Sequence, residues 1–267
     1  MIEVISLSKK YGNFLAVDDV SFCAYPGSVT GLLGPNGAGK TTILKTLCGL
    51  HYPTKGSVQI EGLEVADFPV AVKSLVGYVS ELPALIPNIT PKEFLTYIYE
   101  VYATAGMGKN KELFKRENKK HAVERVVEEC SLKDVLYKPI GSLSKGYRQR
   151  LSFAQALIHD PAVLILDEPM SGLDPAQINQ MRTLIKEVSK AKTVLLSTHL
   201  MQEVEALCNI VHVISKGKLV ASGTAEQIRQ SVKAPSFEKA FLLLTDESQR
   251  TGGETAGAGA KTLKETV

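Results

Sequence analysis

The chain has 267 residues, of which 44% are hydrophobic and 22% are charged, and its formal net charge is +3. These values are typical of one large globular domain or two small ones, and the weak positive charge does not favour a nucleic-acid partner. No apolar run approaches the roughly 18 residues that span a bilayer, and the N-terminus has no signal-peptide pattern. We therefore expect any membrane-spanning part of a complex to belong to another chain.

The four cysteines lie far apart in the sequence, and no pair has the spacing of a metal site or a redox motif. They are Cys23, Cys48, Cys130 and Cys208. We expect reduced, mostly buried thiols in a cytoplasmic protein.

The first eighty residues predict short strands separated by glycine and proline. Strands are expected at 2–7, 14–25, 28–34 and 75–81, a hairpin over 56–65 that turns at Glu61-Gly62, and a helix over about 39–49.

The next segment changes character. From Thr90 to about Lys138 the apolar residues follow a helical period, which predicts a helical insert within an α/β domain. We place the inserted helical subdomain at about 82–158. The Lys- and Glu-rich run at 108–121 is interpreted as a solvated helix face.

Strands alternate with helices again after the insert, and this pattern predicts a mostly parallel sheet. Strands are expected at 162–169, 193–199, 210–215 and 219–224, with helices at 175–190 and just after His199. Residues 1–245 are expected to form the domain, and the polar segment 246–267 is expected to be a disordered tail.

A phosphate-binding loop, "GPNGAGKT" at 34–41, lies between a predicted strand and a predicted helix. Gly37 and Gly39 allow the backbone to curl so that its N–H groups point inward. In such a loop Lys40 reaches the β- and γ-phosphates, and the Thr41 hydroxyl binds Mg²⁺. Because the chain lacks the Asn-Lys-x-Asp segment of guanine-specific loops, ATP is the favoured nucleotide.

Two carboxylates, Asp167 and Glu168, end the apolar strand "VLILD". Strand alternation points them in different directions, so that Asp167 could bind Mg²⁺ while Glu168 faces the water that attacks the γ-phosphate. His199 follows the next predicted strand. Its position at a strand's carboxyl end favours a place in the same site over a purely structural role.

A second anion-binding feature begins at Ser144, in "LSKGYRQRLSFAQAL". A Ser before an apolar helical pattern predicts an N-cap, and the N-terminus of a helix attracts anions. Residues alone do not say which anion it would bind.

Taken in order, these motifs resemble those of ATP-binding-cassette ATPases, the motor subunits of ABC transporters. "GPNGAGKTT" resembles the Walker A motif, "LSKGY" the signature, "LILDEP" Walker B, "SGLD" at 171–174 the D-loop, and His199 the switch histidine. The resemblance covers residues 2–244. It implies a P-loop NTPase fold with a mostly parallel RecA-like sheet, an N-terminal antiparallel β subdomain and the inserted helical subdomain.

The resemblance also implies a set of functional residues. The catalytic residues would be Glu168, His199 and Lys40, and the Mg²⁺ ligands would be Thr41, Glu81 and Asp167. The nucleotide would contact Tyr11, which stacks on adenine, Val17 beside it, Gly34, Pro35, Asn36, Gly37, Ala38, Gly39, Lys40, Thr41 and Thr42, and, from another chain, Ser144 and Gly146.

In this family two cassettes pack head to tail, and ATP lies between the Walker A motif of one and the signature of the other. This arrangement implies a homodimer or heterodimer of cassettes bound to a separate membrane permease, on the inner face of the cell membrane, with no nucleic-acid partner. It would explain why the chain has a second anion-binding helix start but one phosphate loop.

The chain departs from the family pattern at two places. The signature has Lys145 and Tyr147 where Gly and Gln are commoner, and Glu81 stands where the family usually has Gln. We expect function to survive because Ser144 and Gly146 are kept. Glu81, "LSKGYRQR" and the helical segment 236–245 resemble the ABC-2-type exporter branch, which implies export.

Two other functions fit the sequence less well. A soluble cassette acting on DNA or ribosomes usually has long coiled coils or two fused cassettes, for which this sequence has no room. A small-molecule kinase could use the same loop, but the order of the signature, Walker B, D-loop and histidine motifs argues against it.

Overall fold

The computed structural model describes residues 1–104 and 119–245. Its strands are β1 (Ile2–Tyr11), β2 (Phe14–Ala24), β3 (Val29–Leu33), β4 (Lys55–Ile60), β5 (Leu63–Glu64), β6 (Val76–Val79), β7 (Val163–Asp167), β8 (Thr193–Thr198), β9 (Ile210–Ser215) and β10 (Lys218–Gly223). Its helices are α1 (Lys40–Leu47), α2 (Pro69–Leu75), α3 (Pro91–Thr104), α5 (Lys119–Glu129), η2 (Lys133–Val135), η3 (Ile140–Ser142), α6 (Lys145–Leu157), α7 (Pro175–Ser189), α8 (Met201–Leu207), α9 (Ala225–Ser231) and α10 (Phe237–Thr245).

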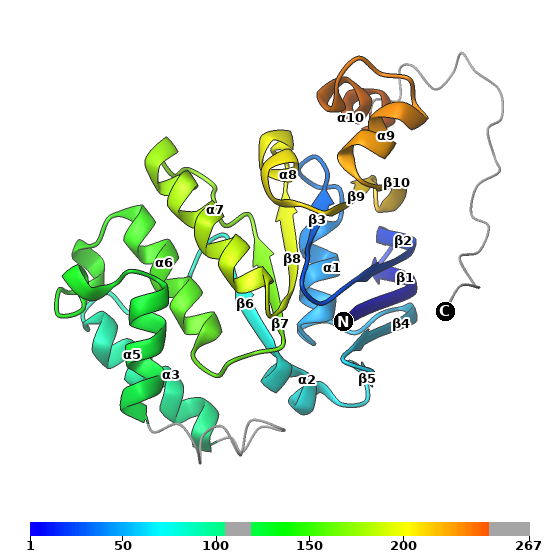
Figure 1. Cartoon of the computed structure of the whole chain (residues 1–267). Coiled ribbons are helices and arrows are strands. Elements are labelled where there is room, and N and C mark those ends of the chain that lie inside the picture. Colours follow the sequence, from blue (N-terminus) through cyan, green and yellow to red (C-terminus); the bar gives the residue numbers. More distant parts are fainter. Residues whose placement is uncertain (105–118, 246–267) are drawn as a thin grey trace.

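The strands form two sheets, as the sequence predicts. The N-terminal sheet is antiparallel, with the order β2-β1-β4-β5, and the larger sheet has the order β10-β9-β3-β8-β7-β6. In the larger sheet β6, β7, β8, β3 and β9 pair in parallel, and β10 pairs antiparallel with β9. Figure 1 shows the two sheets side by side.

The parallel sheet is buried on both faces because its strands are apolar at successive positions. In β7, Leu164 and Leu166 pack into the core shared with α3, α5, α6 and α7. Val163 and Ile165 point to the opposite face and pack with α1 and the antiparallel sheet. The alternation of a strand thus lets one segment contribute to two cores.

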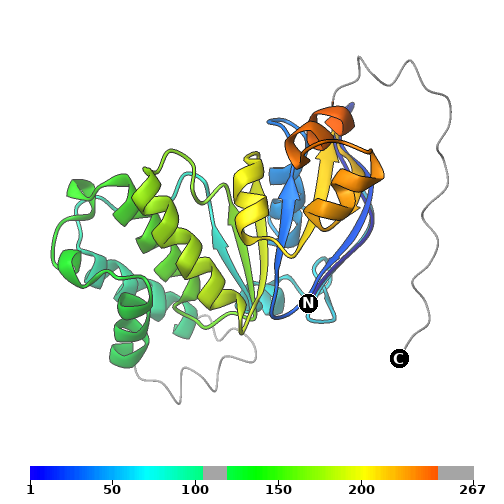
Figure 2. The ribbon, with the colours of Figure 1, turned by 45° about the horizontal axis from the view of Figure 1, so that its top comes forward.

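The helical insert is confirmed in the described residues. Helices α3, α5 and α6 lie together on the side of the molecule away from the antiparallel sheet, in both views (Figures 1 and 2). Their shared core includes Phe94, Leu95, Val126 and Leu151. The expected solvated helix face lies largely at 108–118, and the expected tail at 246–267, and both segments lie outside the described residues.

Two short helices were not predicted from the sequence, α2 and α9. Helix α9 has a capping box, in which Thr224 and Gln227 each bind the other's backbone N–H, so its Thr-x-x-Gln sequence was a usable signal.

All four cysteines are free, two of them buried and two partly buried. In the part of the chain that the structure describes, no helix is long and apolar enough to span a membrane.

Candidate functional site

The topology of the parallel sheet brings three motifs to one edge. Strand β8 lies between β3 and β7, so the residues that follow these three strands are neighbours (Figure 1). Two backbone hydrogen bonds join the three strand ends. The Gly34 N–H donates to the Thr198 carbonyl at 3.3 Å, and the Glu168 N–H donates to the Ser197 carbonyl at 3.1 Å. Candidate ligand residues therefore gather where open α/β sheets bind their ligands.

The loop after β3 wraps around the start of α1. Gly37 and Gly39 have φ angles of +79° and +107°, in the left-handed region that favours glycine. At Gly39 a Cβ atom would lie 2.7 Å from the Ala16 carbonyl oxygen, so a side chain there would also collide with β2. The loop can therefore direct its N–H groups and the N-terminus of α1 toward an anion.

Lys40 is buried at the first position of α1, with 6% of its surface exposed. Its Nζ donates hydrogen bonds to the carbonyls of Gly34, at 2.7 Å, and Pro35, at 3.2 Å. The same atom lies 3.5 Å from Oε1 of Glu168. One ammonium thus joins the phosphate loop to the acidic end of β7.

Glu168 is held in an unusual backbone conformation, with φ at +49°. This conformation is uncommon for a residue with a side chain and is associated with functional sites. Its Oε2 lies 2.9 Å from Nδ1 of His199, so Lys40 and His199 contact the two oxygens of one carboxylate.

Asp167 points away from Glu168, as strand alternation predicts. Its Oδ2 accepts a hydrogen bond from the Tyr78 hydroxyl at 3.3 Å. Burial raises the pKa of Tyr78, and the Asp167 carboxylate raises it further, so the phenol stays a donor. Tyr78 was not singled out in the sequence, because its pairing with Asp167 depends on the register of β6 against β7.

A cavity of about 290 Å³ opens over the phosphate loop. It is lined by Phe14, Ala16, Asn36, Gly37, Ala38, Gly39, Lys40, Thr41, Thr42, Glu81 and Glu168. The structure therefore brings Glu81 and Glu168 to the loop, although they follow different strands.

Val17, which the family resemblance places beside the adenine, packs against the phosphate loop. Its side chain is fully buried, and its Cγ2 lies 3.5 Å from the position that a Cβ atom on Gly39 would occupy. Val17 therefore supports the loop by packing against it. Its neighbour Ala16 lines the cavity instead, one residue away on the same strand.

Tyr11, which the family resemblance assigns to adenine stacking, is not among the residues that line this cavity. Its ring meets His51 edge-on at 5.7 Å, and the Lys9 ammonium lies 5.2 Å from its centre. Phe14, which pairs with Tyr11 across the β1–β2 hairpin, lines the cavity in its place. Tyr11 and Phe14 are direct partners across the hairpin and share one face of the sheet, with Phe14 beside the loop.

Ser144 is the N-cap of α6, as predicted, and its Oγ accepts a hydrogen bond from the Tyr147 N–H at 3.4 Å. Gly146 is buried against α7, where a Cβ atom would lie 2.6 Å from the Gln177 side chain. Neither residue lines the cavity over the phosphate loop. A single chain therefore does not bring the signature segment to its own phosphate loop.

The residues expected to bind Mg²⁺ have chemistry that suits it. Oδ1 of Asp167 is buried and has no hydrogen-bond partner among the described residues, so it is free to accept a ligand. Thr41 and Glu81 both line the cavity. No three His, Cys, Asp or Glu side chains in the described ranges gather to hold a metal alone.

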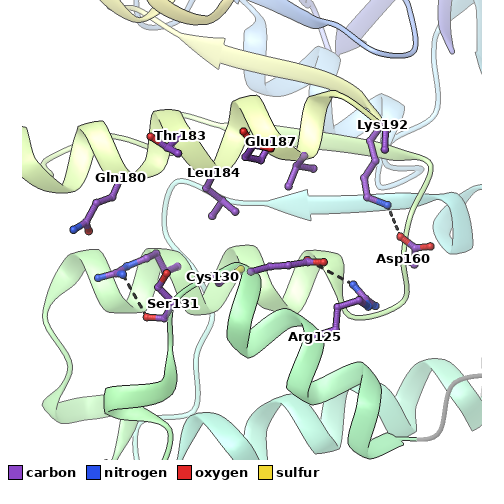
Figure 3. A pocket seen from close by; sticks show the side chains of 13 residues that line it. Arg125, Cys130, Ser131, Asp160, Gln180, Thr183, Leu184, Glu187 and Lys192 are labelled. Carbon is purple, nitrogen blue, oxygen red and sulfur yellow. Dashed lines mark hydrogen bonds and ion pairs between the residues drawn. The ribbon is translucent and has the colours of Figure 1, made fainter.

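A larger cavity, of about 740 Å³, lies between α5, α6 and α7 (Figure 3). Its charged groups already have partners, which include the Lys192–Asp160 and Arg125–Glu129 ion pairs. Arg150 binds the Ser131 carbonyl at 3.4 Å. Nothing in this cavity calls for a charged ligand.

Comparison with known proteins agrees with the geometry. The family model described as "ABC transporter" matches residues 17–171, more than half of the chain. This chain belongs to the ABC transporter ATPases. The cassette is 35% identical over 231 residues to "Nod factor export ATP-binding protein I" of Burkholderia thailandensis, covering 86% of this chain and 73% of that protein.

Two other proteins are similar to this chain over about nine tenths of its length. It is 35% identical to "Probable multidrug ABC transporter ATP-binding protein YbhF" of Escherichia coli over 91% of its own length, and it spans about two fifths (41%) of that protein. A solved structure entitled "Structure of ATP binding subunit of ABC transporter" is 29% identical. It has a TM-score of 0.77 and covers 92% of this chain and 100% of that chain.

Proposed function

We propose that this cassette hydrolyses ATP to ADP and phosphate and thereby drives a separate membrane-spanning subunit. The observation that carries the proposal is the convergence of Lys40 and His199 on the two oxygens of Glu168, beside the phosphate loop. Phosphoryl transfer to water uses a cation that neutralises charge on the phosphates and a group that positions the attacking water, and Lys40 and Glu168 can supply both.

Each of these groups has a distinct task in the proposal. Lys40 binds the β- and γ-phosphates and neutralises charge that develops during transfer. Glu168 accepts a proton from the attacking water. His199 orients Glu168 through its 2.9 Å contact and lies near the γ-phosphate.

Mg²⁺ would be held by Thr41, Asp167 and Glu81, together with phosphate oxygens. Bound there, it would neutralise negative charge on the phosphates. Glu81 adds a negative charge where this family usually has an amide, and we expect this residue to influence how strongly hydrolysis is coupled to transport.

Two chains would complete each site, as a homodimer or a heterodimer. Ser144 is exposed at the start of α6 and lies outside its own chain's cavity, so in this proposal it contacts ATP bound by the partner, together with Gly146. Residues 1–245 would form one cassette, with 82–158 as its helical subdomain.

The membrane subunit would dock where exposed apolar side chains surround the end of β6. Leu50, Leu82, Ile86 and Val101 are 43–80% exposed there, and a groove of about 390 Å³ lies between Leu50 and Val101. An apolar segment of the membrane subunit fits such a surface.

Bound to that subunit, the cassette would lie on the cytoplasmic face of the membrane. The resemblance to the ABC-2 branch and the similarity to a Nod factor export protein favour export as the direction.

The test is the Lys40→Ala variant, which removes the cation of the phosphate loop. We expect weaker ATP binding and no measurable phosphate release with Mg²⁺ present. Lys45→Ala is the matched control, since Lys45 lies on the same helix, in its last turn. Near-normal turnover by Lys40→Ala, or equal losses in both variants, would reject this site.

A further inference from the structure

One buried carboxyl group near the site has no task in the proposed mechanism. Glu203 lies in the first turn of α8, and 3% of its surface is exposed. Acidic side chains are rarely buried without a purpose, because desolvation of a carboxylate is costly. Burial raises the pKa of Glu203, and the nearby Glu168 carboxylate raises it further, while the Thr198 hydroxyl lowers it.

Glu203 is joined to the turn that carries His199. The Thr198 hydroxyl donates a hydrogen bond of 2.6 Å to Oε2 of Glu203. The same hydroxyl oxygen accepts a hydrogen bond from the Leu200 N–H at 3.1 Å. In addition, the Glu203 N–H donates to the Leu200 carbonyl at 3.1 Å. These three bonds fix the residues on both sides of His199.

The imidazole itself is less constrained than its neighbours. The His199 side chain is 41% exposed, and the hydrogen bond described for it is the one to Glu168. A half-exposed side chain with one contact keeps its direction only if the backbone beneath it is rigid. The turn at 198–200 supplies that rigidity, and Thr198 joins it to α8 through Glu203.

Helix α7, which follows the D-loop, also contacts the first turn of α8. The Arg182 guanidinium donates to the Gln202 carbonyl at 3.5 Å, and its positive charge lowers the pKa of Glu203. The charged groups around Glu203 are therefore Arg182 from α7, His199 from the turn, and Glu168 from the end of β7.

We infer that Glu203 is a positioning residue for ATP hydrolysis, which acts through the Thr198 hydroxyl to hold His199 against Glu168. The inference rests on the proposed function. Loss of the Thr198–Glu203 bond should lower kcat, because His199 and Glu168 lose their alignment, and should leave ATP affinity unchanged, because the phosphate loop is untouched.

The first test compares two substitutions at Thr198. Thr198→Val keeps the shape and removes the hydroxyl, and we expect kcat to fall about tenfold to a hundredfold, as misplacement of a reacting group does. Thr198→Ser keeps the hydroxyl and should retain kcat within about threefold of the parent value. The dissociation constant for ATP should stay within about twofold in both variants.

The chain offers a matched control on the same strand. Thr193 in β8 is also buried, and its hydroxyl has no hydrogen-bond partner among the described residues. Thr193→Val should therefore leave kcat unchanged. Melting temperatures of all variants identify any loss that comes from unfolding.

The second test asks whether Glu203 acts through Thr198. Glu203→Ala should lower kcat as Thr198→Val does, and Glu203→Gln, which keeps an acceptor oxygen, should restore most of it. The double variant Glu203→Ala/Thr198→Val should be no slower than either single variant, because both remove the same bond.

The outcomes separate this inference from the proposed function. If the parent protein hydrolyses ATP and Thr198→Val keeps full kcat, or loses no more than Thr193→Val does, the positioning role is rejected while the ATPase stands. Additive losses in the double variant would also reject it. A parent protein without ATPase activity would reject the proposed function itself.

Discussion

At the scale of single residues, the β1–β2 hairpin offers two aromatic rings that could stack on adenine, those of Tyr11 and Phe14. The family resemblance assigns adenine stacking to Tyr11, but Phe14 lines the cavity and is 66% exposed. Tyr11 is 41% exposed and already contacts His51 and Lys9. A ring that is exposed beside the cavity has more apolar surface to gain from a base.

We predict that Phe14→Ala weakens ATP binding about tenfold, since stacking of a base on an aromatic ring contributes about 1–3 kcal/mol. Tyr11→Ala should have a smaller effect, and Phe14→Tyr, which keeps the ring, should bind normally. Equilibrium binding of ATP to the three variants measures this. The reverse order of Tyr11→Ala and Phe14→Ala would return the stacking role to Tyr11.

At the scale of elements, the site depends on close contacts between neighbouring strand ends. Gly34 directly follows β3 at the start of the phosphate loop. A Cβ atom on Gly34 would lie 2.4 Å from the Ile214 carbonyl oxygen in β9 and 3.1 Å from Cβ of Ala38. Backbone on one side and the loop itself on the other leave no room for a methyl group. The start of the phosphate loop is therefore set by its packing against β9.

We predict that Gly34→Ala destabilises the fold by about 1–3 kcal/mol, the usual cost of overpacking, and abolishes tight ATP binding. The control is Gly12→Ala, at a turn with φ of +55° and no atom within 4 Å of the added carbon. That variant should lose some stability from backbone strain and keep its ATP affinity. Denaturant unfolding and ATP binding distinguish the two, and normal ATP affinity in Gly34→Ala would contradict the packing argument.

At the scale of the whole molecule, the phosphate loop and the signature segment of one chain lie apart. The phosphate loop, Glu168 and His199 lie together, whereas Ser144 starts a helix outside that cavity. In the proposed two-chain site, the signature segment of a second chain faces this chain's phosphate loop. Dimerisation should then depend on ATP.

We predict that Glu168→Gln lowers turnover by about 10²–10⁴-fold, the usual contribution of a general base, without loss of ATP binding. Retained ATP should hold two chains together as a dimer on size-exclusion chromatography. Adding Ser144→Arg in this background should return the protein to a monomer that still binds one ATP per chain, because the new side chain would collide with the partner's γ-phosphate.

Ser236→Arg is the matched control for this experiment. Ser236 also accepts a hydrogen bond from the N–H three residues on, at the start of α10, so the control loses a helix cap as Ser144→Arg does. It should stay dimeric with ATP. A double variant with Arg at 144 that remains dimeric would contradict the two-chain site.

Much of the fold and the loop chemistry could be predicted because it depends on local patterns. Alternation and helical period placed the β strands and the insert, and the spacing of glycines around Lys40 placed the phosphate loop. Helix α2 was missed, because a short helix has a weak period.

The sequence by itself determined which groups this protein has for phosphate chemistry, since Lys40, Glu168 and the Ser144 cap are each defined by their immediate neighbours in the chain. Only the tertiary structure decided which of them meet. The insertion of β8 between β3 and β7 brings His199 to Glu168, and the packing of β2 against the phosphate loop brings Phe14 to the cavity. The Thr198–Glu203 bond is local by contrast, because it joins residues on either side of the turn between β8 and α8. Contacts between distant segments follow from packing, for which no local pattern of residues contains a signal.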